Sequence, residues 1–190
     1  MIYEPEIIVI GGSAGSYNVV RNILSSLPKT FRTPIVLCLH RLKVERNGFD
    51  DSLNLVSNLK VIEPMDKQPI QEGYVYLGPA NYHLLIEKNK TFALSIGAEE
   101  NYSRPAIDFT FDTAAEAYNK KLIMILLSGA NVDGAKGIHN GCKRGAITIV
   151  QDPEDALFKI MPGEALKHFT PHKILTADEI IKLLKDDVRF

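Results

Sequence analysis

The sequence contains no tryptophan, only two cysteines and no excess of charge of either sign. The 22 lysines and arginines are balanced by 23 aspartates and glutamates, so there is no basic stripe to bind a nucleic-acid backbone. Cys38 and Cys142 are too few for a disulfide framework, and we expect them to be buried thiols. No apolar run approaches the length of a membrane-spanning helix, and the first residues do not resemble a signal peptide. We therefore expect a cytoplasmic protein that neither binds nucleic acid nor inserts into a membrane.

Four nearly continuous apolar runs, rich in β-branched residues, predict strands that are buried on both faces. They cover residues 6–10, 35–39, 122–127 and 146–150. Strands of this kind are typical of a parallel sheet that is covered by helices. A chain of 190 residues is expected to form one domain, residues 1–190, with a doubly wound α/β fold.

Segments with helical patterning alternate with these strands, at 16–27, 105–120, 134–144 and 177–186. We expect Pro105 in the first turn of its helix and Thr176 or Asp178 at the start of the last one. About residues 60–96 differ, because short strand-like pieces follow one another with turn residues between them. This pattern predicts a hairpin-rich segment or an antiparallel edge beside the mainly parallel sheet.

The stretch Gly11-Gly12-Ser13-Ala14-Gly15-Ser16 connects the first strand to the first helix. Such a glycine-rich turn serves either as a phosphate cradle or as a sharp bend that exposes a nucleophile. A dinucleotide site needs an acidic residue at the end of the second strand, where this chain has His40. No Gly-Lys-Ser/Thr follows the turn, so a Walker-type phosphate loop is also disfavoured.

The nucleophile interpretation is strengthened by the same histidine. Ser13 and His40 each follow a strand, and the carboxyl ends of adjacent parallel strands open into one crevice. Asp133 follows a third strand and is suited to orient the imidazole of His40. Taken alone, Asp133 is more typical of an N-cap for its own helix. Together, the three positions favour a Ser-His-Asp triad, in a chain order that differs from that of ordinary α/β-hydrolases.

A metal site has little support. It would use Cys38, His40, His139 and Cys142, but the last two fall on a predicted helix and no Cys-x-x-Cys pair is present. Cys38 lies inside a strand, which disfavours it as a nucleophile. We expect neither a metal nor another cofactor.

Six stretches, in this order, resemble the catalytic domain of the CheB-type protein-glutamate methylesterases of bacterial chemotaxis: IGGSAGS, LHR, EGYVYLGPANYHLLI, SRPAIDFTFDTAA, LLSGANVDGAKGI and VQDPEDALFKIMPGEAL. The resemblance extends over about residues 6–170. It implies a serine hydrolase that removes methyl esters from glutamates of chemoreceptors and, in some members, deamidates receptor glutamines. Ser13 is then the nucleophile, His40 the general base and acid, and Asp133 the orienting carboxylate.

The resemblance also suggests where the oxyanion binds. The backbone N–H groups of Ala14 and Ala130 are the expected donors, and a main-chain donor survives a change of side chain. The chain departs from the family pattern here: Ala14 replaces threonine, Ala130 replaces methionine and Ala106 replaces serine. Asn131 replaces glycine, and asparagine tolerates a left-handed backbone.

One further departure and three further candidate residues lie near these motifs. Ser16 replaces a family glycine and is expected to act as an N-cap. His83 either lines the crevice or makes structural hydrogen bonds, and Arg104 either holds an acidic receptor segment or is a solvated loop charge. Met161 either closes the pocket or belongs to the core. His83, Arg104 and Met161 are thus candidates for substrate binding.

The expected partner is the methylated cytoplasmic domain of a chemoreceptor. Family members commonly carry an amino-terminal receiver domain, whereas this sequence starts at the first catalytic strand. The sequence is then either the catalytic domain of a longer protein or a stand-alone member under other control, for example by a separate regulatory protein. Two alternatives remain open: a signalling or scaffold domain of the same fold without catalysis, and a carboxylesterase for small molecules.

Overall fold

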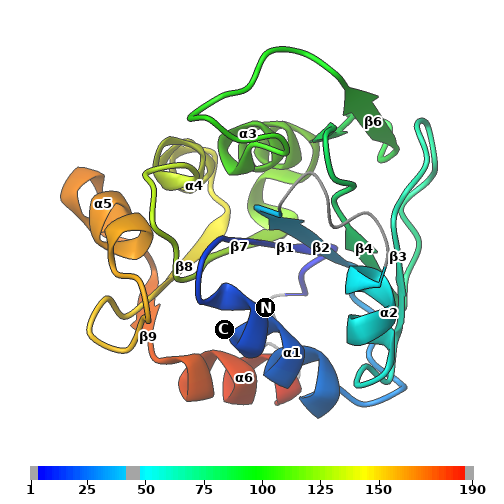
Figure 1. The fold of residues 1–190 in the computed structure, drawn as a ribbon, viewed down its shortest axis with the longest axis horizontal. Helices are drawn as coiled ribbons and strands as arrows, with labels where there is room; N and C mark the ends of the chain where they lie inside the picture. Colours follow the sequence, from blue (N-terminus) through cyan, green and yellow to red (C-terminus); the bar gives the residue numbers. More distant parts are fainter. Residues whose placement is uncertain (1–3, 42–47, 187–190) are drawn as a thin grey trace.

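A computed structural model describes residues 4–41 and 48–186 of the chain. Within these residues, seven parallel strands form the main sheet, in the order β3-β4-β2-β1-β7-β8-β9 (Figure 1). They are β1 (Ile7–Gly12), β2 (Ile35–Leu39), β3 (Lys60–Ile62), β4 (Tyr74–Leu77), β7 (Leu122–Leu126), β8 (Ile147–Gln151) and β9 (Lys173–Leu175). All six residues of β1 are buried, as expected for the central strand. The expected α/β fold with a mainly parallel sheet is confirmed.

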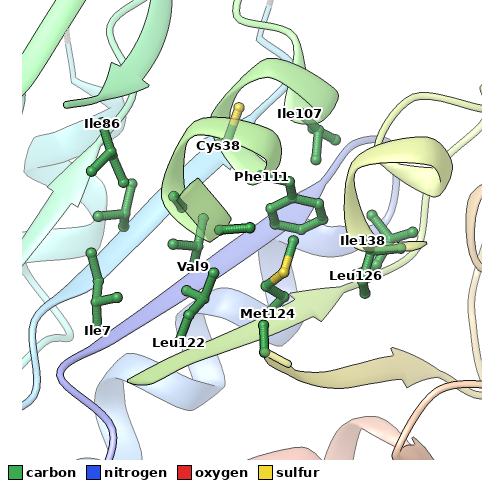
Figure 2. Packing of buried hydrophobic residues seen from close by; sticks show 14 of the residues in the cluster. Ile7, Val9, Cys38, Ile86, Ile107, Phe111, Leu122, Met124, Leu126 and Ile138 are labelled. Atoms are coloured by element: carbon green, nitrogen blue, oxygen red, sulfur yellow. The ribbon is translucent and has the colours of Figure 1, made fainter. Parts of the chain in front are cut away.

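Helices cover both faces of the sheet (Figure 1). Successive strand residues point to opposite faces, so the apolar run of β1 supplies two cores. Ile8 and Ile10 pack with the helices of one face, and Ile7 and Val9 with those of the other, as Figure 2 shows for the second cluster. The first face carries α1 (Ser16–Ser26), α2 (Phe49–Asn54) and α6 (Ala177–Lys185); the second carries α3 (Ile107–Tyr118), α4 (Ala135–Lys143) and α5 (Ile160–His168). A 3-10 turn, η1 (Asn119–Lys121), links α3 to β7.

The antiparallel part of residues 60–96 is shorter than the turn residues in the sequence predict. The antiparallel strands are β5 (His83–Ile86) and β6 (Phe92–Ser95), and an isolated antiparallel bridge also joins Pro69 to Thr91. The pieces at β3 and β4 instead join the main sheet as parallel strands, with β4 beside β2. Short apolar pieces do not reveal the direction of their neighbour, because the same residues suit an antiparallel edge and the outer strands of a parallel sheet.

Two helix starts show how capping sets the boundaries. Thr176 is the N-cap of α6, and it forms a capping box with Glu179, as the sequence predicts. The helix expected from residue 105 starts later, at Ile107, with Ala106 as its N-cap. Pro105 therefore precedes α3 instead of lying in its first turn. The backbone N–H groups of Ile107 and Asp108, which begin the helix, are bound by a side chain from elsewhere in the chain.

None of the helices in the described ranges has the length and apolar character needed to cross a bilayer.

Candidate active site

Three loops meet at the carboxyl edge of the sheet. Gly12 of β1 pairs with Leu39 of β2, so Ser13 and His40 are the next residues on two neighbouring strands. The backbone N–H of His40 donates to Gly12 O at 3.1 Å, and that of Ser13 donates to Ser128 O at 2.9 Å. The loop after β7, which contains Ser128, thus lies on the other side of Ser13. The topology brings the three predicted loops together, as in other open α/β sheets.

A glycine with a left-handed backbone makes the turn after Ser13. Gly15 has a φ of 83° and is the N-cap of α1. A Cβ atom there would lie 2.7 Å from Ser128 Oγ, so both its conformation and its surroundings require glycine. Ser16 is not the N-cap, contrary to expectation. It is the first helical residue, and its hydroxyl donates to Ser13 O at 2.7 Å, which stabilises the bend from inside.

His40 and Asp133 form the central contact of the site. Nε2 of His40 lies 2.8 Å from Oδ2 of Asp133, and their side chains are 12% and 0% exposed. An ionised carboxylate only accepts hydrogen bonds, so Nε2 carries the proton in this pair. The lone pair of a neutral imidazole is then on Nδ1, the nitrogen that is free to take a proton.

Asp133 is also a helix cap, but not of its own helix. Its carboxylate accepts the backbone N–H groups of Ile107 (2.7 Å) and Asp108 (3.1 Å), the first two residues of α3. The N-cap of α4 is instead Gly134, with a φ of 88°. A carboxylate at a helix N-terminus is favoured by the helix dipole. The expectation that Asp133 caps its own helix is therefore wrong, and its carboxylate binds His40 and the start of α3 instead.

These hydrogen bonds keep Asp133 ionised. Burial alone would raise the pKa of its carboxyl group. The hydrogen bonds from His40 and from the amides of Ile107 and Asp108 outweigh burial and hold this pKa below its ordinary value. An ionised Asp133 can stabilise a positive imidazolium on His40.

A second buried carboxylate lies beside the first. Asn101 Nδ2 is 3.3 Å from both Asp108 Oδ2 and Asp133 Oδ1. Asp108 also accepts the N–H of Gly137 at 2.7 Å. Burial, and after it the charge of Asp133, raises the pKa of Asp108 to about 6 against the effect of that hydrogen bond. Asn101 thus bridges two carboxylates with very different proton affinities.

The Nδ1 side of His40 has neighbours that the sequence did not indicate. Ser103 Oγ lies 3.3 Å and Asn131 Nδ2 lies 3.4 Å from this nitrogen. Among the described residues, the Ser13 hydroxyl makes no hydrogen bond to His40, although their backbones are adjacent. Ser103 is 63 positions from His40 in the chain. Ser103 is the first residue of the stretch SRPAIDFTFDTAA, and its place in this family motif is the signal in the sequence that points to it.

The two expected oxyanion donors have different surroundings. Ala130 is exposed and Ala14 is half-buried, and the carbonyl of Ala14 accepts the Ser128 hydroxyl at 2.8 Å. In the described part of the chain, neither of their backbone N–H groups is bound to an acceptor. Asn131 does not adopt the left-handed backbone expected for it. Its side-chain oxygen accepts the Asp133 N–H at 3.2 Å instead, which closes the turn without positive φ.

The three candidate substrate-binding residues are placed differently. His83 is buried, with Nε2 2.8 Å from Ala98 O and Nδ1 accepting the Ala106 N–H at 3.2 Å, which matches the structural interpretation. Arg104 is half-buried and donates to the carbonyls of residues 96 and 97. Its guanidinium holds its own loop in place. Met161 is fully buried and packs against Gly129, at the base of the loop that contains Ala130.

The thiols and the metal candidates do not form a second centre. Cys38 is buried inside β2, and burial raises its pKa to about 12, so it is a protonated core residue. Cys142 is half-buried on α4. No group of three or more potential metal ligands occurs among the residues that the structure describes.

The arrangement is suited to nucleophilic catalysis. A serine on a sharp turn and a histidine follow neighbouring strands, a buried carboxylate orients the imidazole, and two backbone N–H groups of the adjoining loops have no acceptor among the described residues. These are the parts that acyl transfer needs.

Comparison with known proteins gives a consistent result. The family model described as CheB methylesterase matches residues 8–184. A Leptospira interrogans protein, provisionally named for protein-glutamate methylesterase and protein-glutamine glutaminase activities, is 43% identical over 178 residues, which cover 94% of this chain and 92% of that one. The Thermotoga maritima protein-glutamate methylesterase/protein-glutamine glutaminase is 33% identical, and the match covers 92% of this chain but 52% of that one. The crystal structure of the Thermotoga maritima CheB methylesterase catalytic domain superposes with a TM-score of 0.89 at 32% identity, covering 96% of this chain and 98% of that one.

Proposed function

Since the chain belongs to the CheB methylesterase family, we propose that it is a serine hydrolase that removes methyl esters from glutamate side chains of chemoreceptors. The observation that carries this proposal is the bond between His40 and Asp133, at the ends of strands that also bring Ser13 alongside. We extend the proposal to hydrolysis of glutamine amides, because acyl transfer treats the two carbonyls alike. The relatives are named for both activities.

In the first half of the reaction, the Ser13 hydroxyl attacks the ester carbonyl carbon. His40 accepts the hydroxyl proton on Nδ1 while Asp133 stabilises the resulting imidazolium through Nε2. Negative charge builds on the carbonyl oxygen, which the N–H groups of Ala14 and Ala130 bind. One such donor is worth about 10²–10³-fold in rate.

The intermediate then collapses and the carbon–oxygen bond to the methoxy group breaks. His40 returns its proton to the leaving oxygen, and methanol departs, leaving a glutamyl ester on Ser13. A water molecule attacks this ester while His40 takes its proton, and the second collapse releases the glutamate carboxylate and restores Ser13. For a glutamine substrate the leaving group is ammonia.

We place this reaction in the cytoplasm, on the cytoplasmic domain of a chemoreceptor, with residues 1–190 acting as one catalytic unit. The chain spans about half the length of several curated relatives, including those of Geobacter metallireducens and Thermotoga maritima. It covers nearly all of the Leptospira protein. We propose that a separate regulatory protein controls the activity.

The test is methanol release from a methylated chemoreceptor cytoplasmic fragment. We expect release by the wild-type protein and by a Ser25→Ala control, whose serine is exposed on α1 and bonded only locally to Asn22 O. Ser13→Ala should lower the rate at least about 10³-fold, because the variant lacks the hydroxyl that attacks the ester carbonyl. Hydrolysis of p-nitrophenyl acetate without methanol release would indicate a small-molecule esterase. Inactivity on both would indicate a signalling domain without catalysis.

A further inference from the structure

Exposed apolar side chains lie on two sides of the catalytic residues. Tyr102 is 99% exposed and Leu157 is 75% exposed. Large exposed apolar groups that gather near a functional site are typical of a binding surface, whereas isolated ones are common on any protein. The group also includes Val132, Phe158 and Ile160.

Leu157 lies over the nucleophile turn. A Cβ atom on Gly15 would be 2.8 Å from the Cβ of Leu157, so the two backbones are in close contact. The Ser128 hydroxyl ties them together, since it donates to Ala14 O at 2.8 Å and accepts the N–H of Phe158 at 2.9 Å. The position of Leu157 relative to the nucleophile turn is therefore fixed by packing and hydrogen bonds.

Tyr102 belongs to a different loop, the one whose Ser103 contacts the histidine. Figure 1 shows the segment between β6 and α3 as a long loop on the outside of the molecule. Within it, Glu100 and Ser103 exchange two backbone hydrogen bonds, of 3.2 and 2.9 Å, and enclose a two-residue turn. Ser103 contacts Nδ1 of His40, so Tyr102 is one residue away from a neighbour of the imidazole.

The conformation of this turn is unfavourable for tyrosine. Asn101 and Tyr102 have φ values of 49° and 60°. Turns with two positive φ values favour asparagine followed by glycine, because a side chain at the second position meets the backbone. Asn101 follows this rule and Tyr102 does not. The Tyr102 ring is fully exposed and gains no burial within the chain that would offset the cost of its backbone.

We propose that Tyr102 and Leu157 contact apolar side chains beside the methyl-esterified glutamate of a protein substrate, and that Tyr102 thereby selects esters on proteins over small esters. This inference rests on the proposed function and specifies how its substrate is recognised. Ser103, the neighbour of Tyr102, contacts His40, and Leu157 contacts the nucleophile turn, so both exposed side chains stand close to the place where a protein presents its short glutamyl side chain to Ser13. A small ester reaches Ser13 without contacting Tyr102 or Leu157.

The test substitutes Tyr102→Gly, which removes the ring and relieves the positive φ. The variant should be at least as stable as the wild type, so loss of folding does not explain a loss of activity. The control is Asn119→Gly, which relieves a φ of 48° at the other end of α3 without removing an apolar group. Methanol release from the methylated receptor fragment and hydrolysis of p-nitrophenyl acetate are measured for all three proteins.

For Tyr102→Gly we expect the ratio of kcat/KM on the fragment to kcat/KM on p-nitrophenyl acetate to fall about tenfold, mainly through KM on the fragment, as for a central aromatic contact of an interface. Asn119→Gly should keep the wild-type ratio. A Tyr102→Gly ratio within twofold of the wild type overturns the inference, whether both activities persist or both fall together. Wild-type inactivity on the fragment overturns the proposed function itself, and this inference with it.

Discussion

Replacing Asp133 by asparagine tests whether one carboxylate both orients the histidine and caps α3. Its Oδ2 atom accepts hydrogen bonds from His40 and Ile107, and its Oδ1 atom accepts from Asp108, Gly134 and Asn101. An amide has one acceptor oxygen, so its NH₂ group must face N–H donors in either orientation. With the NH₂ group at the Oδ1 position, the backbone N–H groups of Asp108 and Gly134 lose their acceptor.

The other orientation, with the NH₂ group at the Oδ2 position, lowers the free energy of unfolding by less. Only the Ile107 N–H then loses its acceptor, at about 1–3 kcal/mol for a buried donor. His40 can adapt by accepting a hydrogen bond on Nε2 and carrying its proton on Nδ1. In this tautomer His40 cannot take the proton of Ser13, and a comparable tautomer change in a serine hydrolase costs about 10⁴-fold in kcat.

We therefore expect Asp133→Asn to remain folded, to lose about 1–3 kcal/mol in free energy of unfolding and to release methanol about 10⁴-fold more slowly. Urea unfolding followed by circular dichroism measures the first quantity, and methanol release the second. Asp112→Asn is the matched control, because Asp112 is also on α3 but accepts a single bond, from Asn140 Nδ2. An Asp133→Asn variant as stable as Asp112→Asn, or one with more than a tenth of the wild-type rate, would refute the reasoning.

Two further predictions follow from the buried titratable groups. The fold raises the pKa of Asp108 from 3.8 to about 6, so the native state binds its proton more tightly than the unfolded state. The free energy of unfolding of the wild type should therefore fall relative to that of Asp108→Asn by about 3 kcal/mol as the pH rises from about 4 to 6, and then level off. Urea unfolding of both proteins at several pH values measures this difference, and a difference that does not change with pH would contradict the prediction. Burial and a pKa of about 12 should protect the Cys38 thiol from alkylation. Iodoacetamide should therefore modify at most Cys142 in the native protein and both thiols in denaturant, as counted by mass spectrometry. Rapid modification of both thiols in the native state would contradict this prediction.

The parts of this molecule that the sequence could predict share one property, since their signal is local. The apolar runs of β1, β2, β7 and β8 exclude any position but the interior of a sheet. Because the carboxyl ends of parallel strands meet at one edge, the positions of Ser13, His40 and Asp133 after three of these strands predict their convergence.

The remaining features depend on contacts between distant segments. Asp133 caps α3 because the fold brings it to Ile107, 26 residues away, and no local pattern distinguishes such a cap from a cap of its own helix. Ser103 and Asn131 reach His40 from two loops whose paths are set by turn conformations. The parallel direction of β3 and β4 does not follow from their own residues for a related reason. Whether a strand pairs in parallel or antiparallel depends on the neighbour that the fold brings beside it.

The most direct test of the account identifies the hydroxyl that reacts. Ser103 lies within hydrogen-bond distance of His40 Nδ1, whereas the proposed nucleophile is Ser13, so the two serines are clear alternatives. A fluorophosphonate probe forms a stable adduct with an activated serine, and peptide mass spectrometry locates it. The account predicts an adduct on Ser13 that persists in Ser103→Ala and is absent in Ser13→Ala. An adduct on Ser103, or an adduct that survives Ser13→Ala, would contradict it.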